Sequence, residues 1–539
     1  MSSAKTNESS HDAVYTTSGG NPYPEPYETQ RLGTNGPLLL QDYHHIDLLQ
    51  HFHRERIPER VVHAKGSGAL GYLEVTHDIS DICCAKLFSK VGNKAPVVAR
   101  FSTVGGERGS PDTARDPRGF SIKIKTEEGI WDWVFNNTPV FFLRDPVKFP
   151  HFIHTQKRYP QSNLSHGDDP NMFWDYLSQN PESIHQVMIL FGDRGVPDGY
   201  RGMNGYSGHT FKFVNASGTF KYVQIHCLAD QKRGAFLTQE ESVKMAGESP
   251  DHSTKDLFDA IEKKEYPSWT CYIQEMSAEQ AQKFRYNILD LTKVWIFELN
   301  CVWPHKEFPL RPFAKFVLNE NPINYHAQIE QVAFSPSHLP PGVEPSADPV
   351  LQSRLFSYND AHIYRLGINY TQLPVNKSIS PVANFQRDGR MALGDNQGNR
   401  PNYKSTINPM IKYPPRPYQF PGDHEVFIGQ AIADLSVVTE LDFEPARALW
   451  SKVFDDGAKE RFVKNVSGHL GNVSIERIKK DQVAIFLAVD KDLGSQVAKA
   501  IGLKDIPEPL KPQPATQATR FAPNVKSSGQ MIFGNSIPV

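Results

Sequence analysis

Four polar side chains recur at helical spacing in the segment DPVLQSRLFSYNDAHIYRLG, residues 348–367. They are Arg354, Tyr358, His362 and Arg365. Side chains three or four residues apart share one face of an α-helix, and Asp348 and Gly367 suit the beginning and the end of such a helix. A guanidinium one turn from a phenol favours the phenolate, which is a good ligand for ferric iron. The spacing therefore indicates either an iron-binding tyrosine or an ordinary charged stripe that faces solvent.

A lone histidine, His63, lies in RVVHAKGSGALG, residues 60–71, with no cysteine or second histidine beside it to share a metal. Gly66, Gly68 and Gly71 match the spacing of the dinucleotide-binding fingerprint. That fingerprint needs a helix after the second glycine, whereas ALGYLEV continues with residues typical of a strand. We therefore expect no nucleotide loop here, and a buried structural histidine and a catalytic histidine both stay open.

Short β-rich runs separated by Gly and Pro occupy the chain from about residue 61 to about 230, beginning with VVHA at 61–64. Such runs predict an antiparallel barrel or sandwich. Further strands are expected near 267–275 and 313–334. A capping box at Thr238 and Glu241 predicts the start of a helix. Residues 335–425 are rich in Pro and Asn, which is typical of a segment that wraps another surface.

The composition excludes several classes of protein. The 58 basic and 60 acidic residues nearly cancel, so no strong field favours nucleic acid or an anionic membrane. The sequence lacks an apolar run long enough to span a membrane and lacks a signal-type apolar stretch near its N-terminus, so we expect neither membrane insertion nor secretion. The five cysteines form no C-x-x-C pair, which fits a reducing compartment.

The sequence resembles haem catalases of the small-subunit, fungal-like kind. FHRERIPERVVHAKGSGALG (52–71) is similar to the active-site signature of that family, and RLFSYNDAH (354–362) is similar to its haem-ligand signature. Between these two signatures, in the family's order, lie ARFSTVGGERGSPDTARDPRGF and NNTPVFFLRDPVKFPHFIHTQKR, and NQGNRPNY follows the second signature. The similarity extends from about residue 22 to about residue 500. It implies an enzyme that decomposes hydrogen peroxide to water and molecular oxygen.

The resemblance implies an α+β fold built on an eight-stranded antiparallel β-barrel. The expected parts are a disordered N-terminus (1–20), an N-terminal arm (21–60), the β-barrel haem domain (61–334), a wrapping segment with the haem-ligand helix (335–425), a C-terminal helical domain (426–502) and a flexible tail (503–539). It also implies a homotetramer that is peroxisomal or cytoplasmic, although the last three residues, Ile537, Pro538 and Val539, are not the standard peroxisomal signal.

The resemblance also assigns roles at haem b. His63 would be the distal histidine that transfers a proton between the peroxide oxygens, Asn136 the distal amide, and Ser102 the partner of the His63 ring. Tyr358 would be the iron ligand, supported by Arg354. The expected lining and propionate-binding residues are Val62, Val104, Phe141, Phe149, His362, Arg60, Arg100 and Arg365.

Several catalases bind NADPH peripherally, and the matching positions here are His185, Arg194, Asn204 and His226. Leu228 stands where members that bind NADPH often carry a lysine.

Two departures from the family pattern support an alternative, a haem-binding protein with impaired catalysis. Phe135 replaces a glycine usually found before the distal amide, beside an unusual Trp133, and could narrow the pocket. Residues 296–303 look like an insertion that could disturb a barrel strand, so the roles of Trp303 and His305 are not carried over from the family.

Overall fold

The computed structural model describes residues 13–231, 236–294, 302–417, 425–426, 433–515 and 526–527. The chain divides after Glu59 into a small N-terminal unit and a large unit that begins at Arg60. Within the small unit, helix α1 (Tyr43–Phe52) begins at the capping residue Asp42. His44 of this helix is buried, stacks on Tyr23 and accepts or donates a hydrogen bond at 2.8 Å with the Tyr15 hydroxyl.

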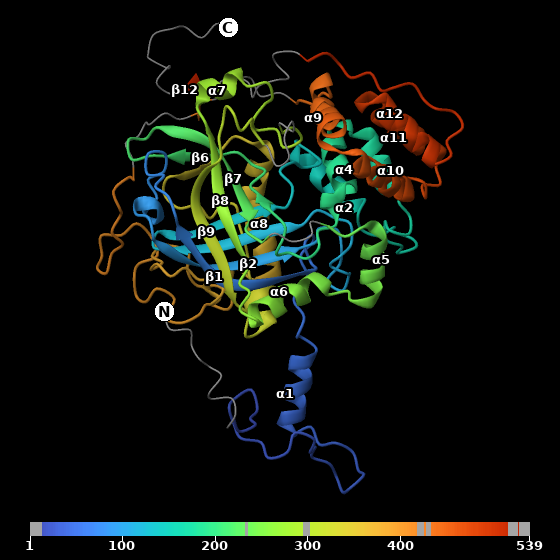
Figure 1. The fold of residues 1–539 in the computed structure, drawn as a ribbon. Helices are drawn as coiled ribbons and strands as arrows, with labels where there is room; N and C mark the ends of the chain where they lie inside the picture. Colours follow the sequence, from blue (N-terminus) through green and yellow to red (C-terminus); the bar gives the residue numbers. More distant parts are fainter. Residues whose placement is uncertain are drawn as a thin grey trace. The chain divides into compact units, whose positions relative to one another are not determined.

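Eight antiparallel strands of the large unit close into a barrel, in the spatial order β7-β5-β4-β3-β2-β1-β9-β8 with β8 pairing back to β7 (Figure 1). The predicted barrel is confirmed. The barrel strands are β1 (Gly66–Val75), β2 (Lys94–Ser102), β3 (Gly119–Thr126), β4 (Gly129–Asn136), β5 (Gly205–Tyr206), β7 (Phe220–Ala229), β8 (Ser268–Met276) and β9 (Arg311–Glu320). Strands β6 (Phe211–Val214) and β10 (Val343–Pro345) extend the sheet beyond β7, and β11 (Glu425–Val426) pairs with β12 (Lys526–Ser527).

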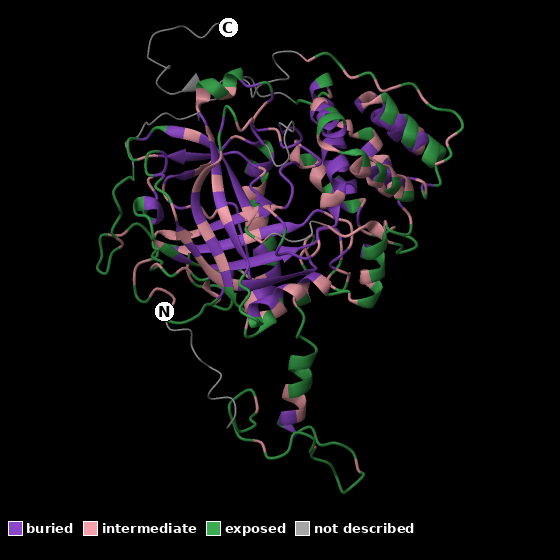
Figure 2. Ribbon diagram, in the orientation of Figure 1, coloured by how far each residue is buried: buried purple, intermediate pink, exposed green. Residues whose placement is uncertain are grey.

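Aromatic side chains fill the barrel, whose strands are largely buried (Figure 2). Trp131 and Trp133 alternate with outward residues along β4, and their rings meet edge to face at 5.2 Å. Phe135 continues this alternation and stacks on Trp133 with ring centroids 5.4 Å apart. Because successive side chains of a strand point to opposite faces, Phe135 lies inside the barrel and Asn136 outside it. Nothing in this arrangement supports the expected narrowing of the pocket by Phe135.

The expectation of a strand at residues 61–64 is wrong, because the chain there is irregular and β1 begins only at Gly66. His63 has a φ of 64°, a left-handed conformation that no strand residue adopts. Gly66, Gly68 and Gly71 all lie in β1, so the helix that a dinucleotide loop requires is not there, and the nucleotide interpretation is wrong.

Strand β9 pairs with both β1 and β8, so the barrel is intact on either side of the suspected insertion. Most of that insertion lies outside the described residues, which stop at Val294 and resume at Val302. Trp303 is buried, and its backbone N–H and C=O both bind the side-chain amide of Gln274. The structure therefore offers no sign that the barrel strands are disturbed.

The predicted helix around Tyr358 is α8 (Pro349–Leu366), and both predicted ends are confirmed. The Asp348 carboxylate accepts from the backbone N–H groups of Val350 and Leu351, and Gly367 ends the helix with a φ of 97°. Residues 367–417 follow with no regular element beyond a single 3-10 turn, as expected of a wrapping segment. The finer domain boundaries stay predictions.

The remaining helices of the large unit pack beside and around the barrel (Figure 1). They are α2 (Phe149–His154), α3 (Asn171–Gln179), α4 (Ile184–Phe191), α5 (Gln239–Glu248), α6 (His252–Glu262), α7 (Ala278–Lys283), α9 (Glu444–Ala448), α10 (Asp456–Leu470), α11 (Glu476–Val489) and α12 (Lys491–Ala500). The predicted capping box starts α5. Helices α3 and α4 share one apolar core with α9 to α12. None of the described helices is long and apolar enough to cross a membrane.

A buried charge network holds the C-terminal region to the barrel domain. The Asp442 carboxylate accepts from Arg144 Nη1 at 2.6 Å and from Lys293 Nζ at 2.7 Å, and both cations also contact Asp290. Burial alone would raise the pKa of Asp442, but Lys293 and Arg144 hold that pKa below its ordinary value. Its charge therefore stabilises the folded chain at neutral pH.

We expect Asp442→Asn to lower the free energy of unfolding by about 3 kcal/mol at neutral pH, because two buried cations lose a shared carboxylate. The contribution of Asp442 is complete above the ordinary carboxyl pKa of about 3.9 and is lost as the pH falls through the lowered folded value. Urea unfolding at neutral and acidic pH measures both effects. Asp505→Asn is the control, because Asp505 is 85% exposed where it pairs with Lys480. Equal losses in the two variants would contradict the prediction.

Candidate active site

The register of the barrel places two candidate residues, Ser102 and Asn136, in one row across adjacent strands. Gly66 of β1 is opposite Ser102 of β2, Ser102 is opposite Gly119 of β3, and Gly119 is opposite Asn136 of β4. Directly opposed residues of antiparallel strands present their side chains on the same face. Ser102 and Asn136 therefore face the same side of the sheet, with a glycine between them.

His63 lies in the gap that Gly119 leaves. Its Nδ1 is 2.9 Å from Ser102 Oγ, and its backbone N–H donates to the Val104 carbonyl at 3.0 Å. A Cβ at Gly119 would lie 2.6 Å from His63 Nδ1 and 2.5 Å from Ser102 Oγ, closer than real contacts allow. Only glycine at 119 lets the imidazole pack against the strand.

The His63 ring is neutral over the whole physiological range. Burial, followed by the positive charges of Arg100, Arg354 and Arg60, lowers its pKa to about 3. Because Nδ1 is held by Ser102, Nε2 is the ring nitrogen left to act on a ligand. The Asn136 carboxamide has no hydrogen-bond partner among the residues that the structure describes. The site thus offers a proton acceptor and a neutral hydrogen-bond donor to a small ligand.

The phenol of Tyr358 is held by one arginine. Arg354 Nη2 donates to the Tyr358 hydroxyl at 2.9 Å and to the Val134 carbonyl at 2.9 Å, and its guanidinium lies 4.9 Å from the centre of the Tyr358 ring. Val134 lies two residues before Asn136 on β4. The expected pairing of Arg354 with Tyr358 is therefore present, and it ties α8 to the strand that carries the candidate amide.

Two further candidates on α8 bind backbone carbonyls of the segment 330–334. His362 Nε2 lies 2.6 Å from the Phe334 carbonyl, and Arg365 donates to the carbonyls of Glu330 and Val332. Arg60 donates to both of the same carbonyls. Together these contacts bring Arg60, His362 and Arg365 around one short stretch of chain.

Buried guanidinium groups at this site outnumber their carboxylates. Burial, together with the charges of Arg100 and Arg365, lowers the pKa of Arg60 well below its ordinary value. Among the described residues, Glu330 is the only carboxylate in an ion pair with any of these three arginines. Arg60 Nη1 and Arg100 Nε are buried N–H donors without a hydrogen-bond partner. A dianionic group such as haem, with two propionates, fits this donor set.

The expected lining residues are close to the candidate histidine or to one another. Val104 accepts from the His63 backbone, and the rings of Phe141 and Phe149 stack with centroids 6.4 Å apart. Val62, Phe141 and Phe149 are partly buried against the large helical core.

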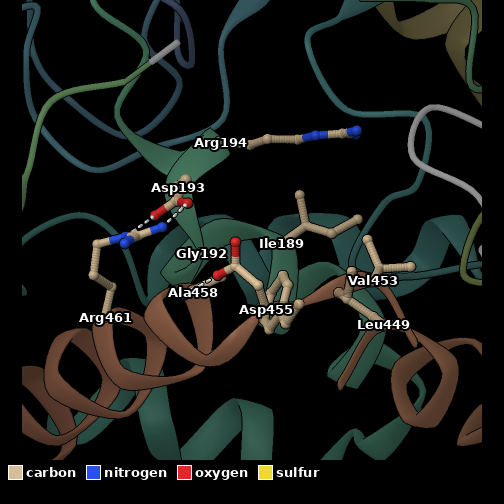
Figure 3. Close-up of a pocket in the computed structure, with 10 residues that line it drawn as sticks. Ile189, Gly192, Asp193, Arg194, Leu449, Val453, Asp455, Ala458 and Arg461 are labelled. Carbon is tan, nitrogen blue, oxygen red and sulfur yellow. Dashed lines mark hydrogen bonds and ion pairs between the residues drawn. The ribbon is translucent and has the colours of Figure 1, made fainter. Parts of the chain in front are cut away.

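The expected NADPH residues are distributed over a different region, beside α4 and β7. Both ring nitrogens of His185 and of His226 are buried without a partner. Asn204 binds the Tyr206 hydroxyl and the Ala229 backbone. Arg194 lines a cavity of about 200 Å³ and extends away from the Asp193–Arg461 ion pair, above Ile189 and Val453 (Figure 3).

Sequence reasoning missed three residues that shape the site. Gly119 makes room for His63, the Asp116 carboxylate accepts from the backbone N–H groups of Val104 and Gly105, and His209 binds the capping residue Asp348. Each acts through strand register or through a contact with a residue that is distant in the sequence. The motif ARFSTVGGERGSPDTARDPRGF contained two of them, but nothing in its spacing distinguished them.

The fold and the site define an antiparallel β-barrel protein whose buried arginines suit an anionic group beside a histidine and an arginine-bound tyrosine. Comparison with known proteins gives the family. The model of the family described as Catalase matches residues 16–409, and that described as Catalase-related immune-responsive matches residues 439–501. The chain belongs to the catalase family, is an enzyme, and decomposes hydrogen peroxide.

Fungal relatives are similar over nearly the whole chain. Catalase of Schizosaccharomyces pombe is 54% identical, covering 90% of this chain and 93% of the relative. Peroxisomal catalase of Candida tropicalis is 53% identical, covering 90% and 98%. A crystal structure of a fungal catalase superposes with a TM-score of 0.86 at 52% identity, covering 90% and 96%. Catalase A from Saccharomyces cerevisiae gives a TM-score of 0.86 at 50% identity, covering 90% and 99%.

We expect Gly119→Ala to lower the oxygen-evolution rate per molecule at least tenfold, because a new methyl group displaces the His63 ring or Ser102; a misplacement of about 1 Å can cost roughly a hundredfold. Gly109→Ala is the control, because no atom lies within 4 Å of its Cβ position. A wild-type rate in Gly119→Ala would show that the His63 ring does not need this space.

Proposed function

We propose that the chain decomposes hydrogen peroxide at haem b bound between Tyr358 and His63. The observation that carries this proposal is the Arg354 guanidinium, which binds the Tyr358 hydroxyl and the carbonyl of Val134, next to the strand end that bears Asn136. When bound, haem would supply an iron that gives two electrons to one hydrogen peroxide, which is reduced to water, and recovers them from a second, which is oxidised to molecular oxygen.

The chain's own residues hold the ligand and move its proton. Arg354 donates a hydrogen bond to the Tyr358 hydroxyl, which orients this oxygen as the ligand for ferric iron. His63 is neutral, so Nε2 can take a proton from one peroxide oxygen and deliver it to the other. A positioned acid/base group of this kind contributes roughly 10²–10⁴-fold to a rate. Asn136 orients the peroxide by donating a hydrogen bond without competing for that proton.

Anionic propionates of haem are assigned to Arg60, Arg100 and Arg365, with His362 packed beside them. The unsatisfied N–H groups of Arg60 and Arg100 support this assignment, since buried charged donors are costly without an acceptor. Val62, Val104, Phe141 and Phe149 line the approach to His63, where apolar walls exclude bulky polar substrates.

NADPH is assigned to the region of His185, Arg194, Asn204 and His226, of which Arg194 lines a cavity. The unpartnered ring nitrogens of the two buried histidines support a polar ligand, and the apolar wall of Leu449 and Val453 suits a ring system. Fluorescence of the filtrate from freshly purified, denatured protein measures bound NADPH. Its absence from wild-type protein would remove this assignment.

The proposed assembly is a homotetramer. Phe356, Ile363 and Tyr364 are exposed on the face of α8 turned away from Tyr358, and exposed aromatic groups of this size are typical of surfaces that other chains cover. Light scattering of the eluted protein gives the assembled mass. A mass equal to one chain would exclude the tetramer.

Several relatives are peroxisomal catalases, from Candida tropicalis, Pichia angusta and Candida albicans. We place this chain in the peroxisome, with the cytoplasm as the alternative. A fluorescent fusion found only in mitochondria would exclude both.

We expect His63→Ala to retain haem and to lose nearly all oxygen evolution, because the proton carrier is removed while the iron ligand stays. Oxygen release and the Soret absorbance of the same sample measure the two properties. Retention of more than a few per cent of the rate would refute the acid/base role.

We expect Tyr358→Phe to purify largely without haem, or with an altered spectrum, because phenylalanine cannot supply an oxygen ligand. The ratio of Soret to protein absorbance measures haem content. Lys377→Ala, an exposed-side-chain change in the wrapping segment, is the control for expression and folding. Normal haem content and activity in Tyr358→Phe would overturn the ligand assignment.

A further inference from the structure

His63 adopts a backbone conformation that is unfavourable for residues other than glycine. Its φ of 64° lies in the left-handed region, where residues other than glycine are uncommon and a side chain pays a steric penalty. Such conformations persist where surrounding contacts over-determine them. The backbone N–H of His63 is fixed by the Val104 carbonyl, and the ring is fixed by Ser102.

The carbonyl of His63 is fixed by Arg100. Arg100 Nη1 donates to the His63 carbonyl at 2.8 Å, and Nη2 donates to the next carbonyl, that of Ala64, at 3.1 Å. The arginine residue is only 3% exposed. A planar fork with two parallel donors sets the orientation of two successive peptide groups, which a single point charge cannot do.

Two glycines of β1 leave room for this fork. Gly68 is directly opposite Arg100, so no side chain stands beside the arginine on that strand. A Cβ at Gly66 would lie 2.9 Å from Arg100 Nη2. The glycine spacing that resembles a nucleotide loop therefore has a different physical reason: a Cβ at Gly66, Gly68 or Gly71 would collide with a backbone carbonyl of the paired strand, and at Gly66 also with the Arg100 guanidinium.

We propose that Arg100 is a positioning residue for the catalytic histidine, which it holds by clamping the carbonyls of His63 and Ala64. This inference rests on the proposed role of His63. It is compatible with a haem propionate at Arg100, because the Nε–H is not used by the clamp and has no partner. The loss of the fork lets the His63 backbone relax, and the imidazole leaves its working position although every catalytic side chain is still present.

The test is Arg100→Lys, measured per bound haem. Lysine keeps the positive charge for a propionate but cannot bridge two carbonyls. We expect the oxygen-evolution rate per haem to fall at least tenfold. We also expect cyanide, titrated by its Soret shift, to bind at least tenfold more weakly, since hydrogen cyanide must give its proton to a base beside the iron. Hydrogen exchange of the peptide around 60–68 should become faster.

Arg447→Lys is the matched control. Arg447 also donates to two successive backbone carbonyls, those of Ala488 and Val489, but it does so in the C-terminal helical region. We expect it to leave the rate per haem and the cyanide affinity unchanged. If Arg100→Lys does not fold, Arg100→Gln takes its place, because the measurements are normalised to the haem that is bound.

Two outcomes distinguish this inference from the proposed function. If His63→Ala is inactive while Arg100→Lys matches wild type per haem in both rate and cyanide affinity, Arg100 serves the propionate alone and the inference is overturned. If His63→Ala itself stays active, the acid/base proposal fails first, and the position of the His63 ring no longer matters to the rate.

Discussion

The guanidinium of Arg354 joins the two parts of the site, which are Tyr358 on α8 and the barrel residues around His63. One of its nitrogens reaches both the Tyr358 hydroxyl on α8 and the Val134 carbonyl on β4. The same strand ends at Asn136, whose register fixes Gly119 and Ser102, and those residues in turn fix His63. A helix that belongs to the wrapping segment is thereby aligned with the barrel. The position of the phenol relative to the imidazole follows from strand register and one charge-assisted hydrogen bond.

The electrostatic potential at the site is set by several buried arginines that lie close together. Burial, followed by the positive charges of Arg100, Arg354 and Arg60, lowers the pKa of His63 to about 3, so the imidazole is neutral at physiological pH. Arg354 also donates a hydrogen bond to the Tyr358 hydroxyl, so this one guanidinium influences both side chains. This arrangement buries guanidinium groups with few carboxylate partners, which is unfavourable in free energy. Binding of a dianionic prosthetic group would offset that free energy.

Sequence spacing predicted the parts that depend on local rules. The face of α8, its cap at Asp348 and its end at Gly367 follow from helical period and capping chemistry, and the structure has them where expected. The β-rich runs predicted an antiparallel barrel or sandwich, and the structure has the barrel that the family resemblance implied. The conformation at residues 61–64 was not predictable in this way, because Val61 and Val62 read as strand while tertiary contacts to Val104, Ser102 and Arg100 impose a left-handed turn. Register likewise depends on partners far along the chain, so the row through Gly119 had no local signal.

The barrel accommodates Phe135, one of the two departures from the family pattern that suggested impaired catalysis. Phe135 occupies the barrel interior because it is one residue from Asn136, and a step of one residue along a strand changes the face. A bulky side chain there adds to the aromatic packing around Trp133 and does not reach the ligand side. Beyond the undescribed stretch at 295–301, the Gln274 amide binds the backbone of Trp303 and the carbonyl of Phe308. Strands β8 and β9 pair with each other, and they also pair with β7 and β1, respectively, so both strands belong to the closed barrel.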